Sequence, residues 1–204
     1  MKVVLALHDF SVVNNRFNFL LALKEHFPDF KISLFTVPID KKEDWGASQI
    51  RDDLLVDIKK HLDWIQIIPH GLNHNGREFK NCDYNSFQWD ILPTIKARFE
   101  EDGLPYEKGF CAPHWVWTDD VVKVLDDEGW WGAVDRDKKM SCPKRFYKYN
   151  FLLNEPFWES DKEVLKIHGH VYGTKNDLGR CFDNLLKLPI DTKFHFVTDF
   201  IEEK

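Results

Sequence analysis

Two histidines, His70 and His74, stand four residues apart in the segment IIPHGLNHNG, directly after an apolar run. Two imidazoles at this spacing can bind one divalent cation, and a His-x-x-x-His pair on a helix is a known zinc-binding arrangement. The zinc-protease form of that pair has a Glu directly after the first His, whereas Gly71 follows here. The glycines and asparagines around the pair would also make a poor helix. We therefore expect a strand end that leads into a turn.

Other residues that can ligate a metal or transfer protons also follow short apolar segments directly. These segments end in His8-Asp9, Pro113-His114-Trp115 and His168-Gly169-His170. If each segment is a strand of a parallel β/α barrel, its carboxyl end lies at the rim where such folds build their catalytic sites. The sequence therefore predicts one site in which these residues and the His70–His74 pair meet.

Asp9, His70 and His74 are the predicted metal ligands. Two imidazoles and one carboxylate that leave coordination positions open are typical of a hydrolytic metal centre, and zinc or another divalent ion suits them. The alternative is that His70 and His74 only form hydrogen bonds with the loop backbone. The presence of Asp9 and of a second histidine pair at the same predicted rim favours the metal site.

The remaining candidates are assigned from their places on strands and loops. His168 and His170 alternate on one strand, so both face the same side of the sheet. We expect one ring to act as a catalytic acid and the other to support it; the alternative is two buried structural histidines. Pro113, His114 and Trp115 are expected to contact the substrate, with an ordinary loop residue as the alternative for His114.

Strands must position these residues, and the apolar pattern supplies them. Short apolar, β-branched runs alternate with amphipathic runs of helical spacing, which is typical of a parallel sheet connected by crossover helices. Predicted strands cover 3–7, 31–38, 64–69, 108–112, 130–135, 163–171 and 193–200, and predicted helices cover 17–27, 48–62, 85–103, 119–129 and 177–188.

About six or seven such units in 204 residues favour a distorted, incomplete (β/α) barrel over an open dinucleotide-binding sheet. No Gly-x-Gly-x-x-Gly motif and no phosphate-binding loop is present in the sequence. The predicted fold class is therefore α/β, with a single domain over residues 1–204. The segment 136–162 has the weakest pattern and is expected to hold a long loop and an irregular strand.

Composition and charge narrow the functional classes. The net charge is -6 and the charged residues are interspersed, so we expect no nucleic-acid partner. No apolar stretch reaches the length of a membrane span, and the opening run MKVVLALHDF is too short for a secretion signal. We therefore expect a cytoplasmic protein with no membrane partner. Its four cysteines, which form no Cys-x-x-Cys pair, are expected to be reduced thiols.

The order of these motifs resembles that of the NodB-type polysaccharide deacetylases, the fourth family of carbohydrate esterases. LALHDF stands where that family has an Asp-Asp pair, and HGLNH stands for its His-x-x-x-His segment. CAP stands for its Arg-x-Pro strand end, and LKIHGH for its late Leu-x-His. The resemblance spans most of the chain and implies a distorted (β/α) barrel of the polysaccharide deacetylase type that binds a divalent metal.

The resemblance also implies roles for residues. The family's first Asp is the catalytic base and its second binds metal, and these positions hold His8 and Asp9 here. The family's Arg, which pairs with that base, falls on Cys111. A neighbouring Arg would favour the neutral form of an imidazole, so a histidine base permits the loss of Arg without requiring it. The expected catalytic set is His8, His168 and His170, with His168 as the acid.

The implied function is metal-dependent removal of an acyl group, such as acetyl, from a sugar, a polysaccharide or a small acylated molecule. One alternative is a carbohydrate-binding protein that kept the barrel and lost the base. Another is a different metal-dependent amidohydrolase in which His168 and His170 are ligands. Turnover of acetylated sugars separates the first two readings, and the identity of the metal ligands separates the first from the third.

Overall fold

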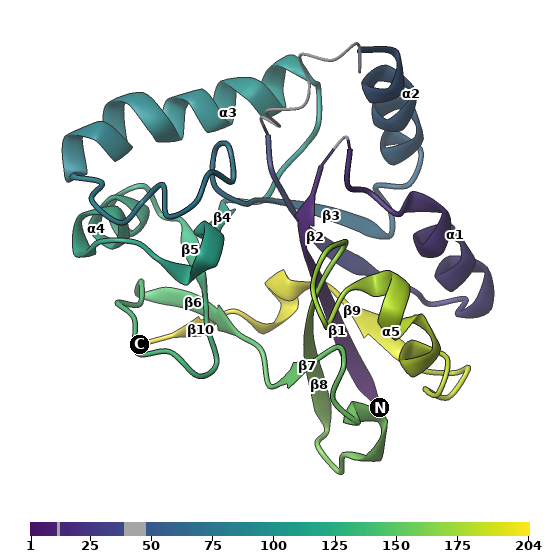
Figure 1. The fold of residues 1–204 in the computed structure, drawn as a ribbon. Helices are drawn as coiled ribbons and strands as arrows, with labels where there is room; N and C mark the ends of the chain where they lie inside the picture. Colours follow the sequence, from purple (N-terminus) through teal and green to yellow (C-terminus); the bar gives the residue numbers. More distant parts are fainter. Residues whose placement is uncertain (12, 39–47) are drawn as a thin grey trace.

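The computed structural model describes residues 1–11, 13–38 and 48–204, with the side chains of 48–51 left out. Strand β1 (Lys2–Phe10) lies at the centre of a parallel sheet (Figure 1). Its short partner β9 (Lys193–His195) pairs with the first residues of β1. The order across the sheet is β3-β2-β1-β8-β7. The bounds of the other strands are β2 Ile32–Thr36, β3 Ile65–Pro69, β7 Phe151–Leu152 and β8 Val164–His170.

A second, smaller sheet completes the barrel-like wall. It has the order β10-β6-β5-β4, in which β4 (Gly109–Phe110), β5 (Trp131–Val134) and β6 (Arg145–Lys148) are parallel and β10 (Glu202–Glu203) is antiparallel. An isolated bridge between His70 and Cys111 connects the ends of β3 and β4. In the described part of the chain no pairing connects β6 to β7, so the barrel is open there. The prediction of a distorted, incomplete (β/α) barrel is confirmed.

Helices cover the outside of this wall (Figure 1). The first sheet is flanked by α1, α2 and α5, whereas α3 and α4 lie on the side of the second sheet. The bounds are α1 Phe17–His26, α2 Ser48–Lys59, α3 Leu92–Glu101, α4 Asp119–Asp127 and α5 Leu178–Leu185, with a π-helical turn, η1 (Ser86–Ile91), before α3. Three short 3-10 helices are η2 (Pro113–Trp115), η3 (Phe157–Glu159) and η4 (Val197–Phe200).

Alternate residues of the strands face two different cores. Val3, Leu5 and Leu7 of β1 belong to a large cluster that includes apolar residues of α1, α3, α4 and α5. Val4 and Ala6 belong to a smaller cluster inside the barrel, with contributions from all the longer strands. Because side chains alternate along a strand, His8 continues the inward series of Ala6. Parallel register pairs Ala6 with His168 and His8 with His170, so these histidines also face inward.

Most predicted elements are present with shifts at their ends, but the segment 136–162 holds two short strands, β6 and β7, and the helix η3, where the sequence predicts one irregular strand. The expected strand 193–200 is wrong beyond His195, because Val197–Phe200 forms a 3-10 helix instead. Two hydrogen bonds hold this turn: the amide of Gln66 donates to the hydroxyl of Thr198, and the hydroxyl of Ser33 accepts from the backbone N–H of Val197. The turn therefore lies at the lower end of the barrel, where the parallel strands begin; the upper end is where they finish. The expected helix 85–103 begins as the π-helical turn η1, and Pro93 lies in the first turn of α3.

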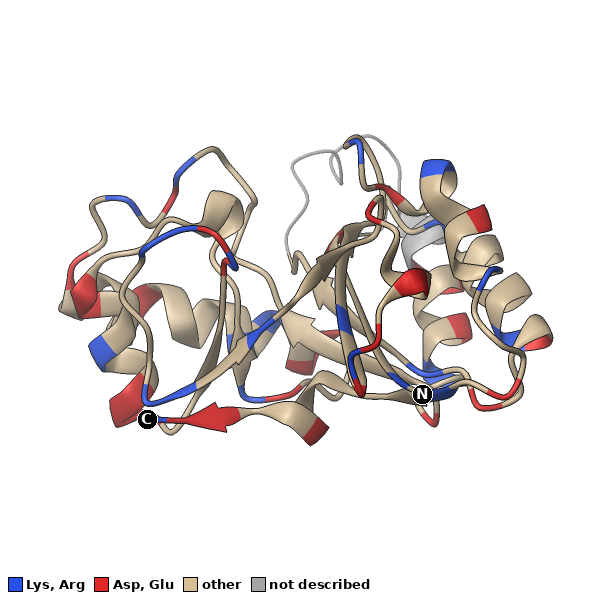
Figure 2. Ribbon diagram, turned by 90° about the horizontal axis from the view of Figure 1, so that it is seen from below, with Lys and Arg blue, Asp and Glu red and all other residues tan. Residues whose placement is uncertain are grey.

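Charged residues of both signs are spread along the described chain. Figure 2 shows acidic and basic residues interspersed over helices and loops. Within the described ranges, no helix combines the length and hydropathy that crossing a bilayer requires. Cys82, Cys111, Cys142 and Cys181 are all free thiols, and three of the four are buried.

Candidate active site

Asp9, His70 and His74 meet at the carboxyl ends of β1 and β3. The Nε2 atom of His70 lies 3.0 Å from Oδ1 of Asp9, and the Nε2 atom of His74 lies 2.9 Å from the same oxygen. One potential ligand atom from each of the three residues lies within 4.8 Å of the other two. The predicted metal ligands therefore converge on one point.

The protonation of His70 indicates that a cation fits at this point. The Nδ1 atom of His70 is 3.0 Å from the carbonyl oxygen of Cys111, which can only accept a hydrogen bond. Nδ1 therefore carries the proton, and in a neutral ring Nε2 presents a lone pair to the Asp9 carboxylate. Two electron-rich atoms 3.0 Å apart repel each other unless a proton or a metal ion lies between them. An imidazole oriented by a backbone carbonyl is also the usual support for a metal-binding histidine.

The electrostatics of Asp9 agree with this reading. Burial alone would raise the pKa of Asp9, but its hydrogen bonds with His70 and His74 outweigh burial and hold the pKa far below its ordinary value. The carboxylate is therefore ionised at all physiological pH values. An ionised carboxylate and two imidazole nitrogens form the donor set that zinc and similar divalent ions accept.

The turn after β3 depends on a glycine. Gly71 has a φ of +68°, and a Cβ atom at this position would lie 2.2 Å from Oε1 of Glu78 and 2.6 Å from Cγ of Pro113. That Glu78 oxygen accepts a hydrogen bond from the backbone N–H of Leu72 at 2.8 Å. A side chain at position 71 would displace the loop that carries His74. This requirement explains why Gly follows His70, where a zinc protease has its Glu.

Backbone strain is concentrated around the same point. Among the described residues, five that are not glycine have a positive φ, and four of them line one cavity: Asp9, His74, His114 and Trp115. A positive φ is unusual for any of these types and most costly for a bulky residue such as Trp115. Strained residues of this kind cluster at functional sites, where the surrounding fold holds them.

His8 is buried, and its ring forms part of the cavity wall. Its ring stacks on Phe35 with a centroid distance of 4.2 Å and contacts His168 edge to face at 4.4 Å. Burial, followed by the charges that His168 and His70 would carry, lowers the pKa of His8 well below its ordinary value. The imidazole is therefore neutral near pH 7 and can accept a proton.

The two histidines of β8 differ in their access to the cavity. His170 lines it, and its Nδ1 atom lies 3.0 Å from Oδ1 of Asn176, which fixes the ring. His168 is not among the lining residues: it is 3% exposed, and its ring stacks on Tyr149 at 4.7 Å. Neither ring nitrogen of His168 has a hydrogen-bond partner in the described part of the chain. The catalytic roles of His8, His168 and His170 stay predictions.

The predicted substrate contacts lie on one turn after β4. His114 and Trp115 line the cavity, whereas Pro113 is buried at the start of η2. The indole of Trp115 is half-buried and lies 5.1 Å from the ring of His8. Trp130 and Trp131, which follow in the sequence, are core residues.

The cavity has a volume of about 570 Å³ and contains residues that the sequence reasoning missed. Arg77, Lys138 and Thr174 line it, and all three lie in loops that follow inward-facing strands. The rule that strand ends form the rim could have found these loops, but it does not say which loop residue reaches inward. Cys111 is a further finding, because its sulfur lies within 4.8 Å of ligand atoms of His8 and His70.

Comparison with known proteins gives matches only among solved structures. No protein-family model matches this chain, and no curated protein matches it. A family 4 carbohydrate esterase (CE4) pseudoenzyme from Bacillus anthracis matches with a TM-score of 0.62 and 14% sequence identity, over 97% of this chain and 64% of that protein. A mutant of that pseudoenzyme with restored enzymatic activity also matches, with a TM-score of 0.61 and 14% identity, over 97% of this chain and 66% of the mutant.

A solved acetyl xylan esterase matches over most of both chains. A family 4 acetyl xylan esterase from Clostridium thermocellum, solved with a cobalt ion, gives a TM-score of 0.60 at 12% identity, over 98% of this chain and 89% of that one. This chain spans 64% of the length of the pseudoenzyme. At these identities the similarity concerns the fold. The chain therefore has the fold of the family 4 carbohydrate esterases, as the order of its motifs predicts.

Proposed function

We propose that this protein is a metal-dependent hydrolase that removes an acyl group, such as acetyl, from a sugar or polysaccharide. The observation that carries the proposal is the convergence of Asp9, His70 and His74 at one point of a cavity of about 570 Å³. Cavities of roughly 300–1,000 Å³ are typical of small-molecule sites. The fold shared with an acetyl xylan esterase supports the same class of reaction.

Asp9, His70 and His74 are the proposed ligands of the ion, for which zinc is the first candidate. A bound divalent cation supplies a Lewis acid that polarises an acyl carbonyl and makes water more acidic. In the overall reaction the water oxygen joins the acyl carbon and the acyl C–N or C–O bond breaks. One proton leaves the water, and one proton joins the departing amine or hydroxyl of the sugar.

His8 is the proposed base. Its ring borders the cavity next to Asp9 and is neutral near pH 7, because burial lowers its pKa. A neutral imidazole in this position can take the water proton. Cys111, which stands where the family has Arg, is a buried neutral thiol, since burial raises its pKa well above its ordinary value. The thiol leaves the neutral form of His8 undisturbed.

His170 is the proposed donor of the second proton. The hydrogen bond from Nδ1 to Asn176 leaves Nε2 as the nitrogen that exchanges protons with the substrate. Burial lowers the pKa of His170, so its ring is mainly neutral near pH 7 and must first take up a proton on Nε2, which the imidazolium form then gives up more readily than a free one. His168 then acts as a positioning residue, because its ring lies 4.4 Å from that of His8 and 4.8 Å from that of His170. Solvent restores both histidines after each turnover.

The experiment is an assay of acetate release. The protein is loaded with Zn²⁺, Co²⁺ or Mn²⁺ and incubated with N-acetylglucosamine oligomers and with acetylated xylan. Release that follows the metal, and that disappears in Asp9→Asn, is the expected result. If the wild-type protein releases no acetate from either substrate with any of these ions, the proposed activity is wrong.

A catalytically inactive carbohydrate-binding protein is the second candidate. Two observations favour it: His8 and Cys111 replace the family's base and Arg, and one protein of the same fold is a pseudoenzyme. The variant His8→Asp, alone and together with Cys111→Arg, tests it. If these variants release acetate while the wild type binds acetylated sugar without turnover, the second candidate is correct. Circular dichroism checks that each variant is folded.

The amidohydrolase alternative has less support. It requires His168 and His170 as ligands, but in the described part of the chain neither belongs to a group of side chains that could share a metal ion. A crystal structure with zinc, measured at the zinc absorption edge, identifies the ligands directly. Zinc bound to His168 and His170 would favour this alternative over the deacetylase.

A further inference from the structure

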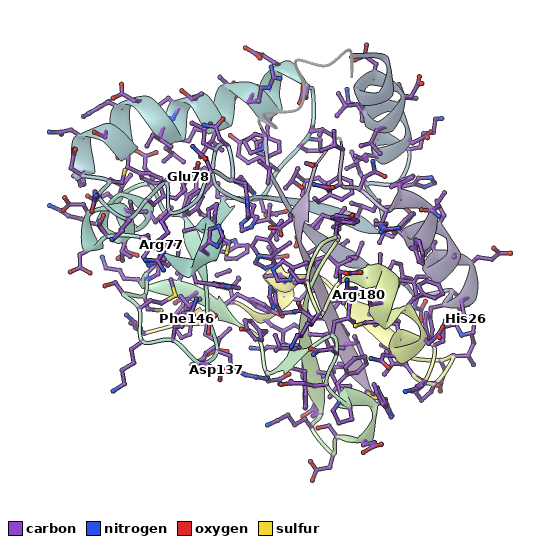
Figure 3. All side chains as sticks on the ribbon, in the orientation of Figure 1. His26, Arg77, Glu78, Asp137, Phe146 and Arg180 are labelled. Carbon is purple, nitrogen blue, oxygen red and sulfur yellow. The ribbon has the colours of Figure 1, made fainter. Side chains whose placement is uncertain are left out.

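Two cationic side chains line the cavity and have no part in the proposed proton transfers. Arg77 comes from the loop after β3 and Lys138 from the loop after β5. Both residues are exposed, so a ligand can reach them. In the view of Figure 3, Arg77 and Asp137, the residue before Lys138, both lie on the side of the second sheet.

Neighbouring groups leave both charges free to act on a ligand. Across residues 1–11, 13–38 and 48–204, neither Arg77 nor Lys138 takes part in an ion pair. The Nζ atom of Lys138 donates a hydrogen bond to the carbonyl oxygen of His114 at 3.2 Å. A neutral carbonyl orients the ammonium group toward the cavity wall without cancelling its charge.

Three carboxylates that lie close to these cations in the sequence have other partners. Glu78, which follows Arg77, accepts hydrogen bonds from two backbone N–H groups of its own loop at 2.8 and 3.2 Å. Asp135 accepts hydrogen bonds from two backbone N–H groups of the loop that carries Lys138, at 2.7 and 3.0 Å. Asp137 pairs with Arg136 at 3.1 Å. These carboxylates therefore hold the loops in place, and among the described residues none of them forms an ion pair with Arg77 or Lys138.

Two cations and one carboxylate are the charged residues, besides histidines, in the described lining of the cavity, so the lining itself has an excess of positive charge. Asp9 is the only carboxylate among its described lining residues, and the two metal-site histidines engage it. The chain as a whole has a net charge of -6. A positive cleft in a low-dielectric wall concentrates its field and draws anions, whereas an uncharged sugar gains nothing from it.

We propose that the sugar bound in this cavity carries an anionic group, a carboxylate or a phosphate, that binds Arg77 and Lys138. A guanidinium group matches the planar pair of oxygens on either anion, and an ammonium group adds a second charge. The acyl group would then face Asp9, His70 and His74 across the same cavity. The assignment of the acyl end rests on the proposed function, whereas the anion preference rests on the two cations.

Calorimetric titration of the zinc-loaded protein tests the preference. One matched pair of probes is N-acetylglucosamine and its 6-phosphate, and the other is glucose and glucuronic acid. At low salt the anionic member of at least one pair should bind about tenfold more tightly, the ratio expected from one charge-assisted hydrogen bond. The ratio should fall toward one at high ionic strength, because salt screens exposed charges. The pair with the larger ratio identifies phosphate or carboxylate as the anion.

Charge-removing variants locate the anion. Arg77→Gln and Lys138→Gln should each reduce the ratio severalfold, and the double variant should abolish it. Lys80→Gln and Lys139→Gln are matched controls, since both residues are exposed, close in sequence and absent from the cavity wall. If the ratio survives in the double variant, the anion binds at the metal and the proposal is wrong. Equal binding within both pairs, or no binding of any probe, also overturns it.

Acetate release, measured on the same samples, keeps this proposal separate from the proposed function. An anion preference that depends on Arg77 and Lys138, without release of acetate from any probe or polymer, supports the preference and contradicts the deacetylase. Acetate release from uncharged sugars without any anion preference supports the deacetylase and contradicts this inference.

Discussion

The two ends of the barrel interior differ in how the polar side chains named here are hydrogen-bonded. At the lower end, Ser33 donates a hydrogen bond to Oε1 of Gln66 at 2.7 Å, and Nε2 of Gln66 donates to Oγ1 of Thr198 at 2.8 Å. At the upper end, the ring nitrogens of His168 have no described partner, and the carboxylate of Asp9 faces the nitrogens of two imidazoles.

Backbone geometry separates the two ends in the same way. Four residues with positive φ surround the upper cavity, whereas Ser33, Gln66 and Thr198 at the lower end have no positive φ. Buried polar groups that are fully paired stabilise a fold, and groups left unpaired or strained persist where function requires them. The lower end is therefore built for stability, whereas the upper end concentrates strained and unpaired groups at the candidate site.

The largest expected effect concerns the metal site. Asp9→Asn should lower zinc affinity by roughly 100-fold or more, because it replaces a charged ligand and second-sphere changes alone cost 10–100-fold. Without metal its stability at pH 7 should fall, because the lowered pKa of Asp9 means that the ionised carboxylate stabilises the folded chain through His70 and His74. Zinc content after dialysis and thermal unfolding measure the two effects, with exposed Asp161→Asn as the control. Retention of zinc by Asp9→Asn would contradict the assignment.

His8→Gln separates proton transfer from metal binding at the same end. Loss of a general base should lower kcat by roughly 10²–10⁴-fold while zinc content stays at the wild-type level. The variant retains a polar side chain of similar size, so its melting temperature is the control. Loss of zinc together with activity would mean that His8 is a ligand, and the base would have to be another group.

Gln66→Leu tests the lower end. The substitution leaves the Ser33 hydroxyl and Thr198 without their partner, which should lower the free energy of unfolding by about 1–3 kcal/mol. Zinc affinity and kcat should not change, because the residue lies at the opposite end of β3 from His70. Urea unfolding and zinc titration measure the two quantities. A drop in zinc affinity would show that the ends are coupled.

His168→Phe should have the smallest effect, and it should raise the free energy of unfolding, whereas Gln66→Leu lowers it. Burial, followed by the nearby His170 and His70, lowers the pKa of His168, so the folded protein keeps the ring neutral while the unfolded chain takes up a proton near pH 6.5. Stability from this residue is present above about pH 6.5 and is lost as the pH falls below it.

Phenylalanine removes this dependence and two unpaired nitrogens, so the variant should gain about 1 kcal/mol relative to the wild type, and more at pH 5 than at pH 8. Urea unfolding of both proteins at the two pH values measures the difference. His195→Phe, at a histidine near the lower end, is the control. If the variant is less stable than the wild type at pH 5, then His168 makes a favourable interaction in the folded protein and the prediction is wrong.

Part of the fold and the site follows from local patterns. The period of two along β1, β3 and β8 places His8, His70 and His170 on one face, because a strand turns its side chains to alternate sides whatever surrounds it. The cap of α4 is equally local: the hydroxyl of Thr118 accepts a hydrogen bond from the backbone N–H of Val121. The order of strands then brings the ends of β1, β3 and β8 to one rim.

The sequence by itself thus determined the (β/α) architecture, the inward face of each long strand and the rim where the histidines meet. Tertiary structure alone decided that His170, and not His168, lies level with His8 at the cavity, since that level depends on the register between β1 and β8. It also decided that Arg77 and Lys138 line the same cavity, because they come from loops of two different sheets. The physical reason is range: alternation and capping act within a few residues, whereas register and loop position depend on packing between segments far apart in the chain.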